Sequence, residues 1–162
     1  MISKYNVIIE GVCLSKKINQ NTYQLKFDNV CKIIYWEVFT KNIKTRKSFT
    51  KSKKDFVNDF HFTKNELSVV IIYNNNNYYF YIEDVQMKNN HLEITVTNKD
   101  VQNNTLFFKK CLPVGCLSQM KLWVDALFVK SDGLPTGPFP SSLSNGGPIP
   151  NFTTMPEGSI SN

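Results

Sequence analysis

Short runs of alternating apolar and polar residues recur along the chain, and this period of two predicts strands. In one of the clearest runs, Tyr23, Leu25 and Phe27 alternate with polar neighbours. Applied along the whole chain, the pattern predicts eight strands, at residues 4–14, 22–27, 31–40, 66–73, 78–85, 91–97, 105–109 and 120–129.

The segments between these runs favour hairpins. Asn74 to Asn77 and the pair Asn89-Asn90 each separate two apolar runs, and asparagine tolerates the left-handed backbone angles of tight turns. The one candidate helix, within Ser52 to Phe60, is short. The sequence therefore predicts an all-β protein, an antiparallel eight-stranded sandwich of jelly-roll type.

The apolar side of each run predicts the core. Nine residues, one or two from each of the stronger runs, are expected to be buried: Leu25, Ile33, Tyr35, Val70, Ile72, Ile94, Val96, Leu122 and Val124.

Composition supports strands over helices. The chain has 162 residues, of which 19 are asparagine and one, Ala126, is alanine, the best helix former. No apolar run approaches the roughly 20 residues that span a bilayer. Residues 1–5 lead directly into an alternating pattern, so we expect no secretory signal.

The last 32 residues differ from the rest. Residues 131–162 hold six of the seven prolines and five of the seven glycines, so we expect a domain at 1–130 followed by an extended arm. The arm keeps spaced apolar residues that could anchor it on neighbouring subunits: Leu134, Phe139, Ile149, Phe152 and Met155. We expect it to be ordered only in an assembly, and the alternative is a disordered terminus.

Positive charge gathers in one segment. Residues 1–130 carry 19 basic and 11 acidic side chains, a net charge of +8, which suits either plain solubility or a polyanionic partner. Residues 41–54 contain no acid and seven basic residues that could bind a polyanion: Lys41, Lys44, Arg46, Lys47, Lys51, Lys53 and Lys54. The alternative is a solvated connection between strands.

The residue types that carry catalysis are sparse. His61 and His91 lack partners at metal-ligand spacing, and Asp55, Asp59 and His61 suit a packed amphipathic segment better than a metal site. Of the four cysteines, only Cys111 and Cys116 lie close in sequence, and we expect reduced thiols. The sequence predicts no enzyme activity, no metal site and no cofactor.

One stretch resembles a known family. Residues 23–27, Asn29-Val30, 32–35 and Glu37-Val38, with the later Tyr78-Tyr79-Phe80, are similar to jelly-roll minor capsid and penton proteins of large double-stranded DNA viruses. The chain departs from that pattern at residues 39–42, where the basic segment begins. The resemblance implies a capsid component of the virion with the eight-stranded jelly roll. The expected reduced thiols and the expected lack of a secretory signal predict assembly in the host cytoplasm or nucleus without secretion.

We therefore expect a structural virion protein, a minor capsid or penton-like component. Its partners would be copies of itself, a major capsid protein, or both, and it would assemble through its β-sandwich and C-terminal arm. The alternative function is a nucleic-acid-binding β-barrel that uses residues 41–54.

Overall fold

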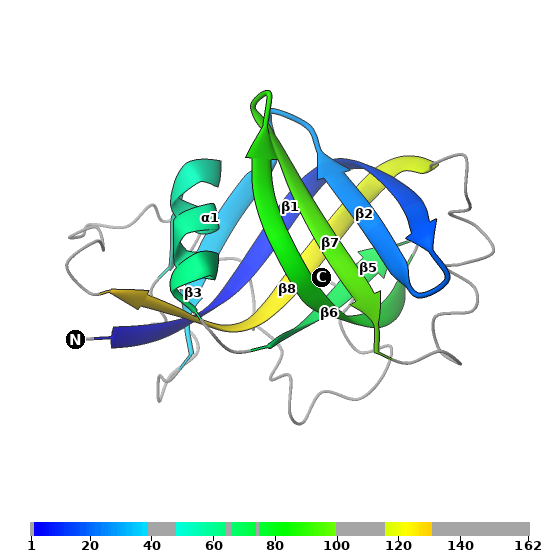
Figure 1. The fold of residues 1–162 in the computed structure, drawn as a ribbon. Helices are drawn as coiled ribbons and strands as arrows, with labels where there is room; N and C mark the ends of the chain where they lie inside the picture. Colours follow the sequence, from blue (N-terminus) through cyan, green and yellow to red (C-terminus); the bar gives the residue numbers. More distant parts are fainter. Residues whose placement is uncertain (1, 39–47, 64–65, 74, 100–115, 131–162) are drawn as a thin grey trace.

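The computed structural model describes residues 2–38, 48–63, 66–73, 75–99 and 116–130, and these form an all-β domain with one short helix (Figure 1). In chain order the elements are β1 (Ile2–Asn19), β2 (Thr22–Phe27), β3 (Lys32–Glu37), β4 (Ser48–Thr50), α1 (Lys53–Phe62), β5 (Leu67–Tyr73), β6 (Asn76–Lys88), β7 (His91–Asn98) and β8 (Cys116–Lys130). The predicted all-β, antiparallel, eight-stranded architecture is confirmed.

All eight strands belong to one sheet that closes on itself. The order is β2-β7-β6-β5-β8-β1-β3-β4, and a further pairing joins β2 back to β1. The 18-residue β1 makes this possible, because its first half pairs with β3 and its second half pairs with β2. Six strands thus form a ring whose opposite walls face each other across the core, as the layers of a sandwich do, and β3 and β4 extend from it.

Asparagine turns set the hairpins. Asn89 and Asn90 both have positive φ, and Lys88 pairs directly with His91, so a two-residue turn joins β6 to β7 as predicted. The turn between β5 and β6 is tighter than the predicted Asn74 to Asn77. Asn76 already pairs with Tyr73, and Asn75 takes the positive φ.

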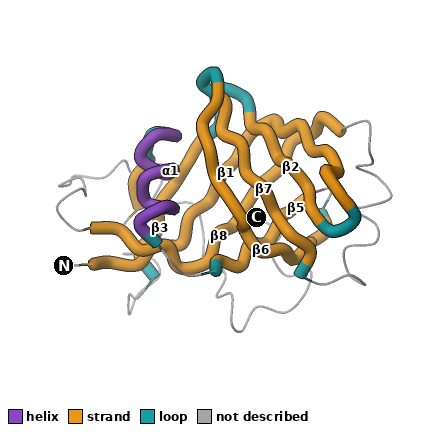
Figure 2. Tube along the Cα trace, in the orientation of Figure 1, coloured by secondary structure: helices purple, strands orange, loops and turns teal. Residues whose placement is uncertain are grey.

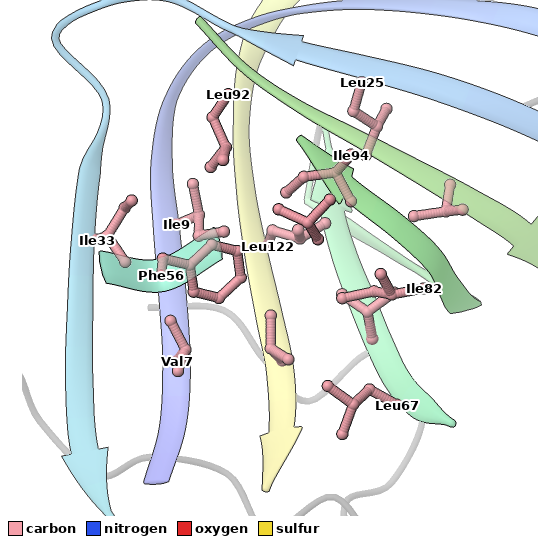
Figure 3. Packing of buried hydrophobic residues seen from close by; sticks show 14 of the residues in the cluster. Val7, Ile9, Leu25, Ile33, Phe56, Leu67, Ile82, Leu92, Ile94 and Leu122 are labelled. Carbon is pink, nitrogen blue, oxygen red and sulfur yellow. The ribbon is translucent and has the colours of Figure 1, made fainter. Parts of the chain in front are cut away.

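Helix α1 begins and ends with side-chain caps. The Ser52 hydroxyl accepts a hydrogen bond from the Asp55 amide at 3.1 Å, and Thr63 ends the helix and also accepts one from the Phe128 amide at 2.9 Å. The helix packs against β6 and β8 beside the strands (Figure 2). Its Phe56 side chain is fully buried among Val7, Ile9 and Leu122 (Figure 3).

Inward-facing residues of all eight strands form the main core. Eight of the nine predicted core residues are buried, and Ile72 is only half-buried. On β5 the predicted inward face is wrong: Val69 and Ile71 face the main core, whereas Val70 and Ile72 belong to a second, outward cluster. The run 67–73 is apolar on both faces, so its period could not distinguish them.

Two further features of the strands go beyond what the sequence pattern predicts. On β8 the pairing with β1 shifts register between Tyr5 and Val7, which places Leu127 and Val129 inward although they are out of phase with Leu122 and Val124. Strand β4 is not predicted by the sequence pattern, because it lies within the basic segment. The strand predicted at residues 105–109 lies outside the described residues.

Candidate interaction surface

A continuous apolar row crosses the outside of the sheet. Ile8 on β1 stands opposite Ile34 on β3 and opposite Trp123 on β8, and Trp123 in turn stands opposite Val70 on β5. Tyr79 on β6 continues the row from Val70. Directly opposed residues share a face of the sheet, so five neighbouring strands contribute to one surface. With Trp36 and Ile72, these side chains form a cluster separate from the main core, which we call the outer row.

The outer row is buried although it faces away from the core. Ile8 is 6% exposed, Trp36 3% and Trp123 2%. Further along the same strand, the outward residues Val12 and Leu14 are 36% and 40% exposed, and Ile18 is 50% exposed. The outward face of β1 is therefore mixed: the charged residues Lys4, Glu10 and Lys16 interrupt its apolar residues, and the apolar residues of its second half are exposed.

The tryptophans of the outer row carry unused hydrogen-bond donors. Trp36 and Trp123 are the two tryptophans of the chain. Neither buried indole Nε1 has an acceptor among the residues that the structure describes. A buried indole N–H normally finds a partner, so these two donors are unusual among the described residues.

A surface hollow of about 420 Å³ lies one step further along the strands. Lys121 and Glu10, which neighbour Trp123 and Ile8 on the same face, form an ion pair there at 3.2 Å. The hollow is lined by Glu10, Ile72, Asn75, Gln119, Met120 and Lys121. Because Glu10 and Lys121 already pair with each other, the hollow forms a polar border to the apolar outer row.

The basic segment is divided by the structure. Lys41, Lys44, Arg46 and Lys47 lie outside the described residues. Lys54 is exposed, whereas the Lys53 ammonium donates to the Asn29 carbonyl at 2.8 Å. Lys51 points inward and pairs with Asp59. Among the described residues of the basic segment, Lys54 is therefore the one exposed candidate for binding a polyanion.

Lys51 belongs to a buried polar network. Its ammonium lies 2.7 Å from Asp59 Oδ2, and the Tyr35 hydroxyl donates to the same oxygen at 2.6 Å. The Lys51 side chain is 8% exposed and that of Asp59 14%. Burial, followed by the hydrogen bond to Asp59, raises the pKa of the Tyr35 phenol well above its usual value of 10. The protonated Tyr35 hydroxyl therefore joins β3 to α1 through Asp59.

The remaining predicted site residues fall partly outside the described ranges. The arm residues Leu134, Phe139, Ile149, Phe152 and Met155 lie outside them, as does Cys111. Cys13 is buried and Cys31 half-buried, and neither forms a disulfide bond within the described residues. Within the described ranges no three histidine, cysteine or acidic side chains gather as a metal site would require. No helix in those ranges is long and apolar enough to cross a membrane.

Sequence reasoning missed the outer row as a surface. A signal was present, because the run 31–40 is apolar on both faces, and that pattern indicates a strand covered on both sides. What could not be read was that Ile34, Ile8, Trp123 and Val70 stand side by side, since this depends on the pairing of strands far apart in sequence.

Comparisons with known proteins add no relative to these observations: no protein-family model, no curated protein and no solved structure matches this chain.

Proposed function

We propose that this chain is a structural virion protein, a minor capsid or penton-like component that assembles through the faces of its β-sandwich and its C-terminal arm. The observation that carries the proposal is the group of exposed apolar residues Val12, Leu14 and Ile18 on the outward face of β1, beyond the Glu10–Lys121 ion pair that borders the outer row. Exposed apolar residues gathered on one sheet face are typical of protein–protein contact surfaces.

The resemblance of residues 23–38 to jelly-roll capsid proteins supports the virion assignment. The expected partners are further copies of the chain, a major capsid protein, or both.

Sedimentation velocity over a concentration series tests the assembly role. We expect the full chain to self-associate, and the double variant Val12→Lys, Leu14→Lys to remain monomeric, because two charges would enter the contact. Val30→Lys is the matched control, because Val30 is 81% exposed but lies in the turn between β2 and β3. Electron microscopy of the associated species then asks whether they are particles or capsomers. A wild-type chain that stays monomeric at every concentration would remove self-assembly from the proposal.

A nucleic-acid-binding role is the second candidate, favoured by seven basic residues within 41–54 and by the closed ring of six strands. Lys51 is engaged with Asp59, so the informative variant neutralises Lys44, Arg46, Lys47 and Lys54 instead. If these residues bind phosphates, the slope of log affinity against log salt for single-stranded DNA should fall by about 0.7 for each phosphate that the variant no longer neutralises. No binding by the wild-type chain at ~50 mM salt would end this candidate.

A further inference from the structure

The turn between β2 and β3 carries an apolar side chain into solvent. Val30 is 81% exposed, more than any other large hydrophobic residue that the structure describes. Two hydrogen bonds hold the turn in place: the Asp28 amide donates to the Val12 carbonyl at 3.0 Å, and the Lys53 ammonium donates to the Asn29 carbonyl at 2.8 Å. An apolar side chain presented in this way gains free energy when an apolar environment covers it.

The hairpin between β6 and β7 projects beside this turn. Phe27 at the end of β2 pairs with Leu92 on β7, and Leu92 pairs in turn with Met87 on β6. Both turns therefore leave the sheet at the same end, which lies at the top of Figure 1. Met87 is 41% exposed there. We call residues 28–31 and 87–90 together the tip.

Positive charge surrounds the tip. Four lysines lie in the tip or beside it: Lys32, Lys53, Lys54 and Lys88. Two aspartates, Asp28 and Asp55, lie among them, so four positive charges stand against two negative ones. Glu10 stands opposite Lys32, but it already forms an ion pair with Lys121. The tip thus combines exposed apolar side chains with an excess of positive charge.

The surface of an anionic lipid bilayer matches this combination. Its headgroups carry negative charge that attracts nearby lysines, and its interface accepts apolar side chains. Binding to such a surface grows with both the buried apolar area and the electrostatic attraction. Single-stranded nucleic acid fits the tip less well, because valine and methionine offer no ring on which a base can stack.

We propose that the tip binds the surface of anionic lipid bilayers. Val30 and Met87 enter the headgroup region, where their apolar area is removed from water. Lys32, Lys54 and Lys88 contact the lipid phosphates and carboxylates. The binding is peripheral and reversible, because two side chains bury little area in the bilayer. It does not depend on the virion assignment or on self-association.

Vesicle flotation in a density gradient tests the proposal on the full chain, and it separates lipid-bound protein from assembled particles. We expect binding to vesicles of phosphatidylserine and phosphatidylcholine, little binding to pure phosphatidylcholine, and weaker binding as the salt concentration rises. Lys32→Gln with Lys88→Gln should weaken binding about 25-fold, at about fivefold for each lysine. Val30→Ser with Met87→Ser should weaken it several-fold, because both changes remove apolar area.

A tryptophan placed in the tip gives a second readout. The native Trp36 and Trp123 are 3% and 2% exposed, so the indole introduced by Val30→Trp dominates any change in emission. Vesicles that contain phosphatidylserine should shift this emission to shorter wavelength. An unchanged emission from vesicle-bound protein would show that residue 30 stays in water, and would overturn the proposed contact.

Matched control variants change the same chemistry elsewhere. Val12→Ser with Leu14→Ser removes exposed apolar side chains from the outward face of β1 and should leave vesicle binding unchanged. Lys4→Gln with Lys99→Gln removes two positive charges near the start of β1 and beyond the end of β7, away from the tip, and should have little effect. A loss in these controls equal to that in the tip variants would refute the proposal, because overall charge would then explain the binding. Circular dichroism confirms that each variant is folded.

Two further results would overturn the proposal. The first is no binding of the wild-type chain to phosphatidylserine vesicles at low salt. The second is binding of single-stranded DNA that requires Lys32 and Lys88 but neither Val30 nor Met87, without vesicle binding, which would assign the tip to nucleic acid. Failure of the chain to self-associate would bear on the proposed function alone.

Discussion

Replacing Asp59 by asparagine should destabilise the protein substantially, because one carboxylate oxygen satisfies two buried groups. Asp59 Oδ2 accepts from the Tyr35 hydroxyl at 2.6 Å and pairs with the Lys51 ammonium at 2.7 Å. Asparagine has nearly the same volume, so the substitution leaves packing intact. It removes the negative charge and leaves the Lys51 ammonium buried without a counter-charge.

The expected magnitude follows from burial. Removing one member of a buried ion pair costs about 3–5 kcal/mol, because the other charge stays desolvated. The small remaining exposure of both side chains favours the lower end, about 3 kcal/mol. For a chain of this length each kcal/mol lowers Tm by about 2–4 °C, so Tm should fall by roughly 6–12 °C.

Urea titration followed by circular dichroism measures this change, with Asn58→Asp as the matched control on the exposed side of α1. The triple variant Asp59→Leu, Lys51→Met, Tyr35→Phe should recover much of the loss, since apolar residues can replace a buried pair and no buried hydroxyl is then left without an acceptor. An Asp59→Asn variant within about 0.5 kcal/mol of wild type would show that Lys51 reaches water freely, and would refute the reasoning.

Three further predictions concern the core and the alkaline limit. Val96→Asp should cost several kcal/mol in urea titration, because a charge would enter a fully buried position on β7; wild-type stability would contradict the strand register. Gly11→Ala should cost about 1–3 kcal/mol, because the new methyl would lie 2.8 Å from Cys31 Cβ and 3.1 Å from its Cα; a thermal melt like wild type would show that β1 and Cys31 can separate. Tyr35→Phe should flatten the loss of stability expected above about pH 10, as measured by urea titration over a pH series. The raised pKa of Tyr35 means the folded chain keeps a proton that the unfolded chain releases above about pH 10, so its stabilising effect is full below that pH and declines above it. Equal alkaline slopes for Tyr35→Phe and wild type would assign the loss to other groups.

Much of the fold could be predicted from the period of apolar residues. The β2 run at 22–27 and the β7 run at 91–97 alternate cleanly, because one of their faces meets the core and the other meets water. The turn at Asn89-Asn90 was equally readable, since few residues other than glycine and asparagine accept positive φ. These signals are local, and each is complete within a few residues.

The tertiary structure decided what depends on distant pairing. Val70 and Trp123 lie more than fifty residues apart, yet they stand opposite each other, and only the β5–β8 pairing creates the outer row. Lys51 also depends on distant contacts. The sequence pattern predicts a surface charge, but α1 brings Asp59 next to Lys51, and the two side chains form a buried ion pair. Sequence determined which residues prefer strands and turns, because those preferences are local. The closure of the sheet decided which face of an all-apolar strand points inward and which lysine forms a buried ion pair. Burial depends on neighbouring residues that only folding brings together.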